Sequence, residues 1–95
     1  MSEDRVLSHL LACVGEECGE VQQVVGKSLR FGIHDYHPKT GEENWLRLTE
    51  EVGDLLAVYE MLANHLGFSG ELDKAHIRQK KKKVVKHMKA YGDLK

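Results

Sequence analysis

The sequence predicts an all-α protein built from a single three-helix unit. Apolar residues recur at helical spacing over two long stretches. One proline and 6% aromatic residues suit helices better than a many-stranded sheet. A length of 95 residues predicts one domain over residues 1–95. Because so short a chain buries only a thin core by itself, we expect the unit to complete a helical bundle as a homodimer or homotetramer.

The first predicted helix runs from about Arg5 to Leu29. On a helical wheel, Glu17 lies at the border of its apolar stripe, with Glu20 next outward and Glu16 further out. Such a border leaves a carboxylate half buried. The stripe comprises Leu7, Leu10, Leu11, Val14, Cys18, Val21, Val25 and Leu29.

Residues 30–41 are predicted to form a loop, because they contain two glycines and a proline and have no steady period. Loops of about this length in compact domains are often functional, so we expect a lid over a substrate. At its end, Thr40 and Glu43 have the spacing of a capping box, which predicts that the next helix begins at Glu42.

The second predicted helix runs from Glu42 to Leu66 and resembles the central helix of a bundle. Glu51 and Asp54 lie between its main apolar face and a second apolar zone. A carboxylate in that position requires a partner. The main face comprises Trp45, Leu48, Val52, Leu55, Leu56, Tyr59, Leu62, Ala63 and Leu66.

The third predicted helix follows a turn at residues 67–70 and runs from Glu71 to Tyr91, with Gly92 as its C-cap. Its other faces are densely basic, and Lys81 falls inside the apolar stripe, so this side chain must snorkel or find an anion. The stripe is narrow and comprises Ile77, Val84, Val85, Met88 and Tyr91.

Charge and cysteine usage limit the partners and the compartment. The net charge of −1 gives no global field to gather nucleic acid, so nucleic acid is not an expected partner. Cys13 and Cys18 are five residues apart on one helix and point in different directions, which predicts reduced thiols. No apolar run approaches the roughly 20 residues of a membrane span, and the N-terminus lacks signal-peptide features. We therefore expect no membrane partner and a cytoplasmic location.

Four carboxylates form two pairs with i, i+3 spacing, Glu17 with Glu20 and Glu51 with Asp54. Each pair projects from one helix face. One such pair alone is typical of solvated helix surface, but four acids aimed at a common space repel one another unless a cation lies between them. Mg²⁺ prefers oxygen ligands and commonly bridges carboxylates to substrate phosphates. The pattern favours a magnesium site for phosphate chemistry, where Mn²⁺ could substitute.

The acids occur as EECGE at residues 16–20 and EEVGD at residues 50–54, the pattern EExxE followed by ExxD. This pattern resembles the all-α nucleoside triphosphate pyrophosphohydrolases of the MazG-like superfamily, and nearly the whole chain can be laid on it. The resemblance implies that Glu17, Glu20, Glu51 and Asp54 bind Mg²⁺. It also implies that water attacks the α-phosphorus of a nucleoside triphosphate and releases a nucleoside monophosphate and pyrophosphate.

Segments 27–32 and 83–88, together with Asn44, look like small phage and bacterial members of the superfamily, which implies a substrate-binding role for Asn44. The gap of 30 residues between Glu20 and Glu51 is slightly wide for the family. That departure puts the conformation of the loop in doubt more than the metal site.

Four residues near these acids have candidate roles. Glu16 or Glu50 could orient the attacking water as a general base, although both also suit an exposed surface. Lys27 lies about two turns after Glu20 on nearly the same face, where its ammonium can meet a phosphate. Arg30 is a second candidate at the mouth of the loop. Both cations could instead simply favour the dipole at the helix end.

Other candidate contacts depend on how the chain folds. Lys80, Lys81 and Lys83 could reach a triphosphate if the third helix caps the site, although most of that lysine run suits a solvated face. Phe31, Tyr36 and Trp45 could stack on a base, and for Trp45 a core position is favoured.

Three alternatives to this function stay open. Phosphoribosyl-ATP pyrophosphatase shares the acids, and product analysis with each substrate separates the two. A nucleic-acid or protein interaction module using the basic C-terminal helix predicts salt-dependent binding without metal-dependent pyrophosphate release. A degenerate family member would bind nucleotides without hydrolysing them.

Overall fold

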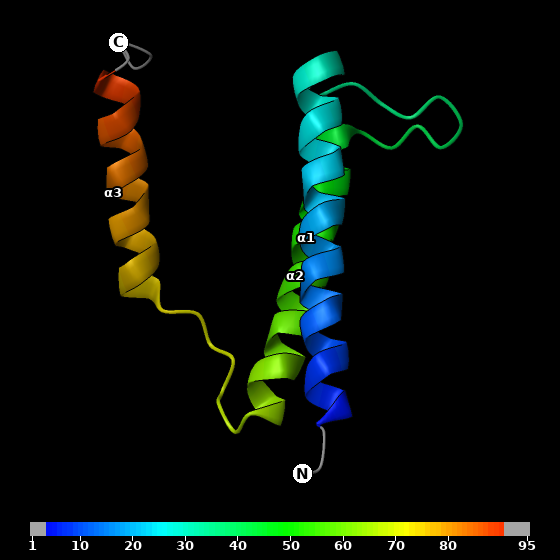
Figure 1. Ribbon diagram of the computed structural model, residues 1–95. Coiled ribbons are helices and arrows are strands. Elements are labelled where there is room, and N and C mark those ends of the chain that lie inside the picture. Colours follow the sequence, from blue (N-terminus) through cyan, green and yellow to red (C-terminus); the bar gives the residue numbers. More distant parts are fainter. Residues whose placement is uncertain (1–3, 91–95) are drawn as a thin grey trace.

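A computed structural model describes residues 4–90, which form three α-helices and no strand. α1 spans Arg5–Phe31, α2 spans Asn44–His65 and α3 spans Lys74–Ala90. Figure 1 shows α1 and α2 side by side as an antiparallel hairpin, with α3 standing apart from them at the end of an extended connection. The all-α prediction and the number of helices are confirmed.

Along each helix, the residues that face the other helix in the α1–α2 seam are spaced alternately four and three positions apart. This repeat keeps one line of side chains facing the other helix. Glu17 and Glu51 occupy central positions of the seam and are half buried there. The buried or half-buried positions of this repeat are Leu10, Val14, Glu17, Val21, Val24 and Ser28 on α1, and Asn44, Leu48, Glu51, Leu55, Val58 and Leu62 on α2.

Hydrogen bonds connect the start of α1 to the end of α2, at the end of the helix pair that the loop does not join. The Asp4 carboxylate accepts a hydrogen bond from the backbone N–H of Leu7 at 2.9 Å and so caps α1. The same carboxylate accepts from His65 Nε2 at 2.9 Å, which joins the start of α1 to the end of α2. The register of the two helices is therefore held where no loop connects them.

The expected capping box at the start of α2 is not formed, and the helix begins at Asn44 rather than at Glu42. Its first two N–H groups donate to loop carbonyls instead: Asn44 N to Asp35 O at 2.9 Å and Trp45 N to Ile33 O at 3.0 Å. Because backbone carbonyls satisfy these donors, no side-chain cap is needed, and Glu43 pairs with His34 at 3.0 Å.

The loop between α1 and α2 is more ordered than its composition indicates. Tyr36 and Glu43 form an isolated antiparallel bridge, and His37 N donates to Glu42 O at 2.9 Å. Two glycines with positive φ make the bends, Gly32 at 106° directly after α1 and Gly41 at 72° before the segment that leads back to α2. The segment is therefore a short hairpin that projects from one side of the helix pair, as Figure 1 shows.

α3 differs from its prediction in both position and extent. It begins at Lys74 rather than Glu71, because Asp73 accepts a hydrogen bond from His76 N at 3.0 Å in the manner of an N-cap. Tyr91 and the predicted cap Gly92 lie outside the described residues. Within residues 4–90, α3 packs against neither α1 nor α2. The expected three-helix core within one chain is thus replaced by a two-helix hairpin and a separate helix.

Much of the predicted apolar surface is uncovered in the single chain. Leu29 is 83% exposed and Trp45 57% exposed, so the expected core position of Trp45 is wrong for one protomer. The buried line on α1 passes through Leu10 and Val24 and not through the centre of the predicted stripe. Other exposed apolar residues include Leu11, Val25, Val52, Leu56, Tyr59, Val84 and Val85. Within residues 4–90, α2, which was expected to be a central helix, packs against α1 alone.

Candidate metal centre and adjoining cavity

Three carboxylates meet at the middle of the α1–α2 seam. One oxygen each from Glu17, Glu51 and Asp54 lies within 4.8 Å of the others. Glu17 comes from α1, and the two remaining acids come from successive turns of α2, so the cluster forms only when the helices pack in this register. We call this cluster the acid trio.

The acid trio is electrostatically unfavourable without a cation. Burial raises the pKa of the Glu17 carboxyl above its ordinary value, and the negative charges of Asp54 and Glu51 raise it further. Among residues 4–90, no Lys, Arg or His forms an ion pair with any of the three. A set of hard oxygen donors lacking a cationic partner fits Mg²⁺ or Mn²⁺.

The remaining predicted acids lie around the acid trio and outside it. Glu20 is half buried and Glu16 is exposed, and the charges of both raise the pKa of Glu17, although less than the trio partners do. Glu50 is exposed. The structure thus brings together three of the four predicted ligands, and Glu20 does not share the 4.8 Å cluster.

A cavity of about 250 Å³ opens beside the end of α1, the loop hairpin and the start of α2. We call it the loop cavity. Its lining mixes aromatic rings, cationic groups and hydrogen-bonding side chains. The lining residues are Lys27, Phe31, Asp35, Tyr36, His37, Pro38, Asn44 and Arg47.

Asn44 joins the two helices at this cavity. Its side chain is 5% exposed, and its amide Nδ2 donates to Gly32 O at 2.9 Å. The residue directly after α1 is thereby tied to the first residue of α2. Nδ2 donates to Gly32 O, and the side-chain Oδ1 of Asn44 is a hydrogen-bond acceptor.

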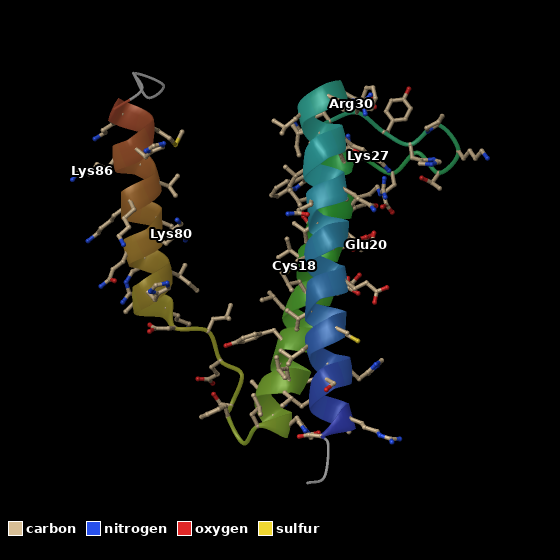
Figure 2. The ribbon with its side chains drawn as sticks, viewed as in Figure 1. Cys18, Glu20, Lys27, Arg30, Lys80 and Lys86 are labelled. Carbon is tan, nitrogen blue, oxygen red and sulfur yellow. The ribbon has the colours of Figure 1, made fainter. Side chains whose placement is uncertain are left out.

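The predicted cationic residues separate into two groups. Figure 2 shows Lys27 and Glu20 on the side of α1 from which the loop hairpin projects, and Lys27 lines the loop cavity. Arg30 lies outside the lining, with its guanidinium 5.1 Å from the centre of the Phe31 ring. The same figure places Lys80 on α3, which stands apart from α1 and α2. Lys81 and Lys83 belong to the same exposed helix.

Sequence reasoning missed Arg47, Asp35, His37 and Pro38 as lining residues. Arg47 had a usable signal, because it lies three residues after Asn44 and therefore on the same helix face. Asp35, His37 and Pro38 had none, since their positions depend on the fold of the loop hairpin.

Of the comparisons with known proteins, the one with family models gives a match, and it covers most of the chain. A family model described as the MazG nucleotide pyrophosphohydrolase domain matches residues 6–89. No significant match was found among curated proteins or solved structures. Within the described residues, no helix combines the length and apolar character of a membrane span.

Proposed function

This chain belongs to the MazG nucleotide pyrophosphohydrolase family, and from this we propose that it hydrolyses nucleoside triphosphates to nucleoside monophosphates and pyrophosphate with Mg²⁺. The acid trio carries the proposal, because three carboxylates within 4.8 Å of one another and without a cationic side-chain partner suit a divalent ion. Mn²⁺ is expected to substitute.

Glu17, Glu51 and Asp54 would hold the ion, with Glu20 proposed as a further ligand from the same face of α1. When bound, Mg²⁺ offsets phosphate charge and polarises the phosphoryl oxygens. The chain's own residues orient the reaction. Lys27, which lines the loop cavity and lies on the same side of α1 as Glu20, is proposed to hold a phosphate oxygen. Arg30, at the end of α1, is proposed as a second phosphate contact.

The reaction proceeds by water attack on the α-phosphorus. A bond forms from the water oxygen to that phosphorus, the bond from phosphorus to the α,β-bridging oxygen breaks, and pyrophosphate leaves. A carboxylate must accept the proton of the water. Glu16 and Glu50 are the proposed candidates, because each is adjacent in sequence to a member of the acid trio and neither belongs to it.

We further propose that the active assembly is a homodimer or homotetramer. The exposed apolar residues of α1, α2 and α3 suit burial against a second copy. The basic α3 and the acid trio also have complementary charge, so α3 in the assembly could bring Lys80, Lys81 and Lys83 to the phosphates. We expect the protein in the cytoplasm, where its free thiols Cys13 and Cys18 stay reduced.

A nucleotide panel tests the function. Each canonical ribo- and deoxyribonucleoside triphosphate, together with phosphoribosyl-ATP, is incubated with the protein and Mg²⁺ or EDTA. We expect metal-dependent monophosphate plus pyrophosphate, and no diphosphate plus phosphate. Preference for phosphoribosyl-ATP would assign the related pyrophosphatase activity instead. No turnover with any substrate, together with salt-dependent nucleic-acid binding, would favour the interaction module built on α3.

A further inference from the structure

The loop cavity differs from the acid trio in chemistry and in position. The trio consists of carboxylates alone, half-buried Glu17 and Glu51 in the helix seam and exposed Asp54 beside it. The loop cavity has an aromatic and mixed polar lining and lies where the loop joins α1 to α2. Its volume of about 250 Å³ falls just below the roughly 300 Å³ at which pockets for complete small ligands begin. The cavity therefore suits one part of a nucleotide better than the whole molecule.

We propose that the loop cavity is the nucleoside subsite, which takes the base and sugar of a nucleoside triphosphate while the phosphates extend toward the acid trio. This inference rests on the proposed function. It assigns substrate selection to the loop hairpin and the start of α2, and it assigns Tyr36 as the residue on which the base stacks.

Tyr36 has the geometry of a stacking platform. Its side chain is 64% exposed although it lines the cavity, so much of the ring is open to a ligand. Two backbone hydrogen bonds, His37 N to Glu42 O and Asn44 N to Asp35 O, flank its position in the bridge with Glu43. A fixed backbone reduces the entropy lost when a base docks on the ring.

Phe31 is less suited to this role. The guanidinium of Arg30 lies over its ring, 5.1 Å from the ring centre, and so occupies a face that a base would need. Phe31 therefore forms an apolar wall of the cavity. Asn44 and Asp35 belong to the same lining, and their side-chain oxygens are acceptors that suit ligand donors such as a base amino group or a sugar hydroxyl.

The path from the loop cavity to the acid trio passes Lys27. Lys27 lines the cavity, and Glu20 lies seven residues earlier on the same side of α1, roughly 10 Å along the helix axis. An extended triphosphate attached to a nucleoside is long enough to follow this path. Lys27 then contacts the phosphates while Tyr36 contacts only the nucleoside.

This difference allows a direct test with Tyr36→Ala. For the wild type, KM for its best nucleoside triphosphate, Ki for the matching nucleoside monophosphate and Ki for inorganic tripolyphosphate are measured with Mg²⁺. In Tyr36→Ala, we expect KM for the triphosphate and Ki for the monophosphate to rise roughly 5- to 150-fold, the range for loss of one base–aromatic stack, and Ki for tripolyphosphate to stay unchanged. Tyr36→Phe, which keeps the ring, should retain near wild-type constants.

Two further variants control the interpretation. Lys39→Ala alters the loop hairpin at a residue outside the cavity lining and should change none of the constants. Lys27→Met should weaken the binding of both the nucleotide and tripolyphosphate. If the wild type is active and Tyr36→Ala has the same KM for the triphosphate and the same Ki for the monophosphate, the nucleoside subsite is overturned. The proposed function then stays intact.

Failure of the proposed function gives a different result. If the wild type releases no pyrophosphate from any nucleotide, calorimetric binding of nucleoside monophosphates replaces the kinetic constants. Tyr36-dependent monophosphate binding would then support the subsite without the activity. Binding that Tyr36→Ala leaves unchanged, or no binding by the wild type, would overturn it.

Discussion

Asn44→Ala tests whether one buried amide holds the closed end of the hairpin. The variant loses the hydrogen bond from Nδ2 to Gly32 O and the packing of a side chain that is only 5% exposed. Gly32 O keeps a second donor, the N–H of Asp35 at 3.2 Å, so no carbonyl is left unpaired. The expected loss is therefore that of a net hydrogen bond plus modest packing, about 1–2 kcal/mol.

Thermal unfolding followed by circular dichroism measures this loss. In a domain of this size each kcal/mol lowers Tm by about 4–8 °C, so Asn44→Ala should melt roughly 5–15 °C below the wild type at one fixed protein concentration. Asn64→Ala makes the same change at an exposed position of α2 and should leave Tm nearly unchanged. Equal melting of Asn44→Ala and the wild type would refute the role of the amide.

Asn44→Asp sharpens the same prediction. It places a carboxylate oxygen opposite the Gly32 carbonyl oxygen, and because the site is nearly buried the introduced acid should have a raised pKa. At pH 7 this variant should be less stable than Asn44→Ala. The deficit should shrink as the pH falls through that raised pKa, since a protonated carboxyl can donate to Gly32 O. A pH-independent difference between the two variants would contradict the assigned hydrogen bond.

Three other predictions concern the acid trio, the open end of the hairpin and the apolar surface. Glu17→Gln should abolish pyrophosphate release and the rise in Tm on adding Mg²⁺. Because the pKa of Glu17 is raised in the folded protein, metal-free Glu17→Gln should be more stable than the wild type at pH 7. This gain in stability should vanish as the pH falls toward the ordinary glutamate range near about 4.3. A difference in stability that does not change with pH would argue against repulsion among the acids. Asp4→Asn should lower Tm at pH 7, because the pKa of Asp4 is lowered first by the Leu7 N–H and then by His65, and the difference should disappear as the pH falls below the ordinary aspartate range of about 3.9. Leu56→Lys should shift sedimentation toward monomer and reduce turnover, whereas an unchanged assembly would place the interface elsewhere.

Local patterns were sufficient to predict the three helical segments and all three members of the acid trio. Helical spacing of apolar residues predicted α1 to within two residues at its C-terminal end, because that period is a property of neighbouring turns. The i, i+3 spacing of Glu51 and Asp54 likewise placed both acids on one face of α2. Their approach to Glu17 followed from the position of each acid beside an apolar stripe.

Contacts between distant residues decided the rest. The capping of α2 by Ile33 and Asp35 carbonyls, the lining position of His37 and the separation of α3 have no counterpart in the local pattern. The sequence alone determined which segments are helical and which acids share a face, because these properties depend on residues within a turn or two. Only the tertiary structure decided which apolar line is buried and where the loop cavity forms, because burial depends on which surfaces meet.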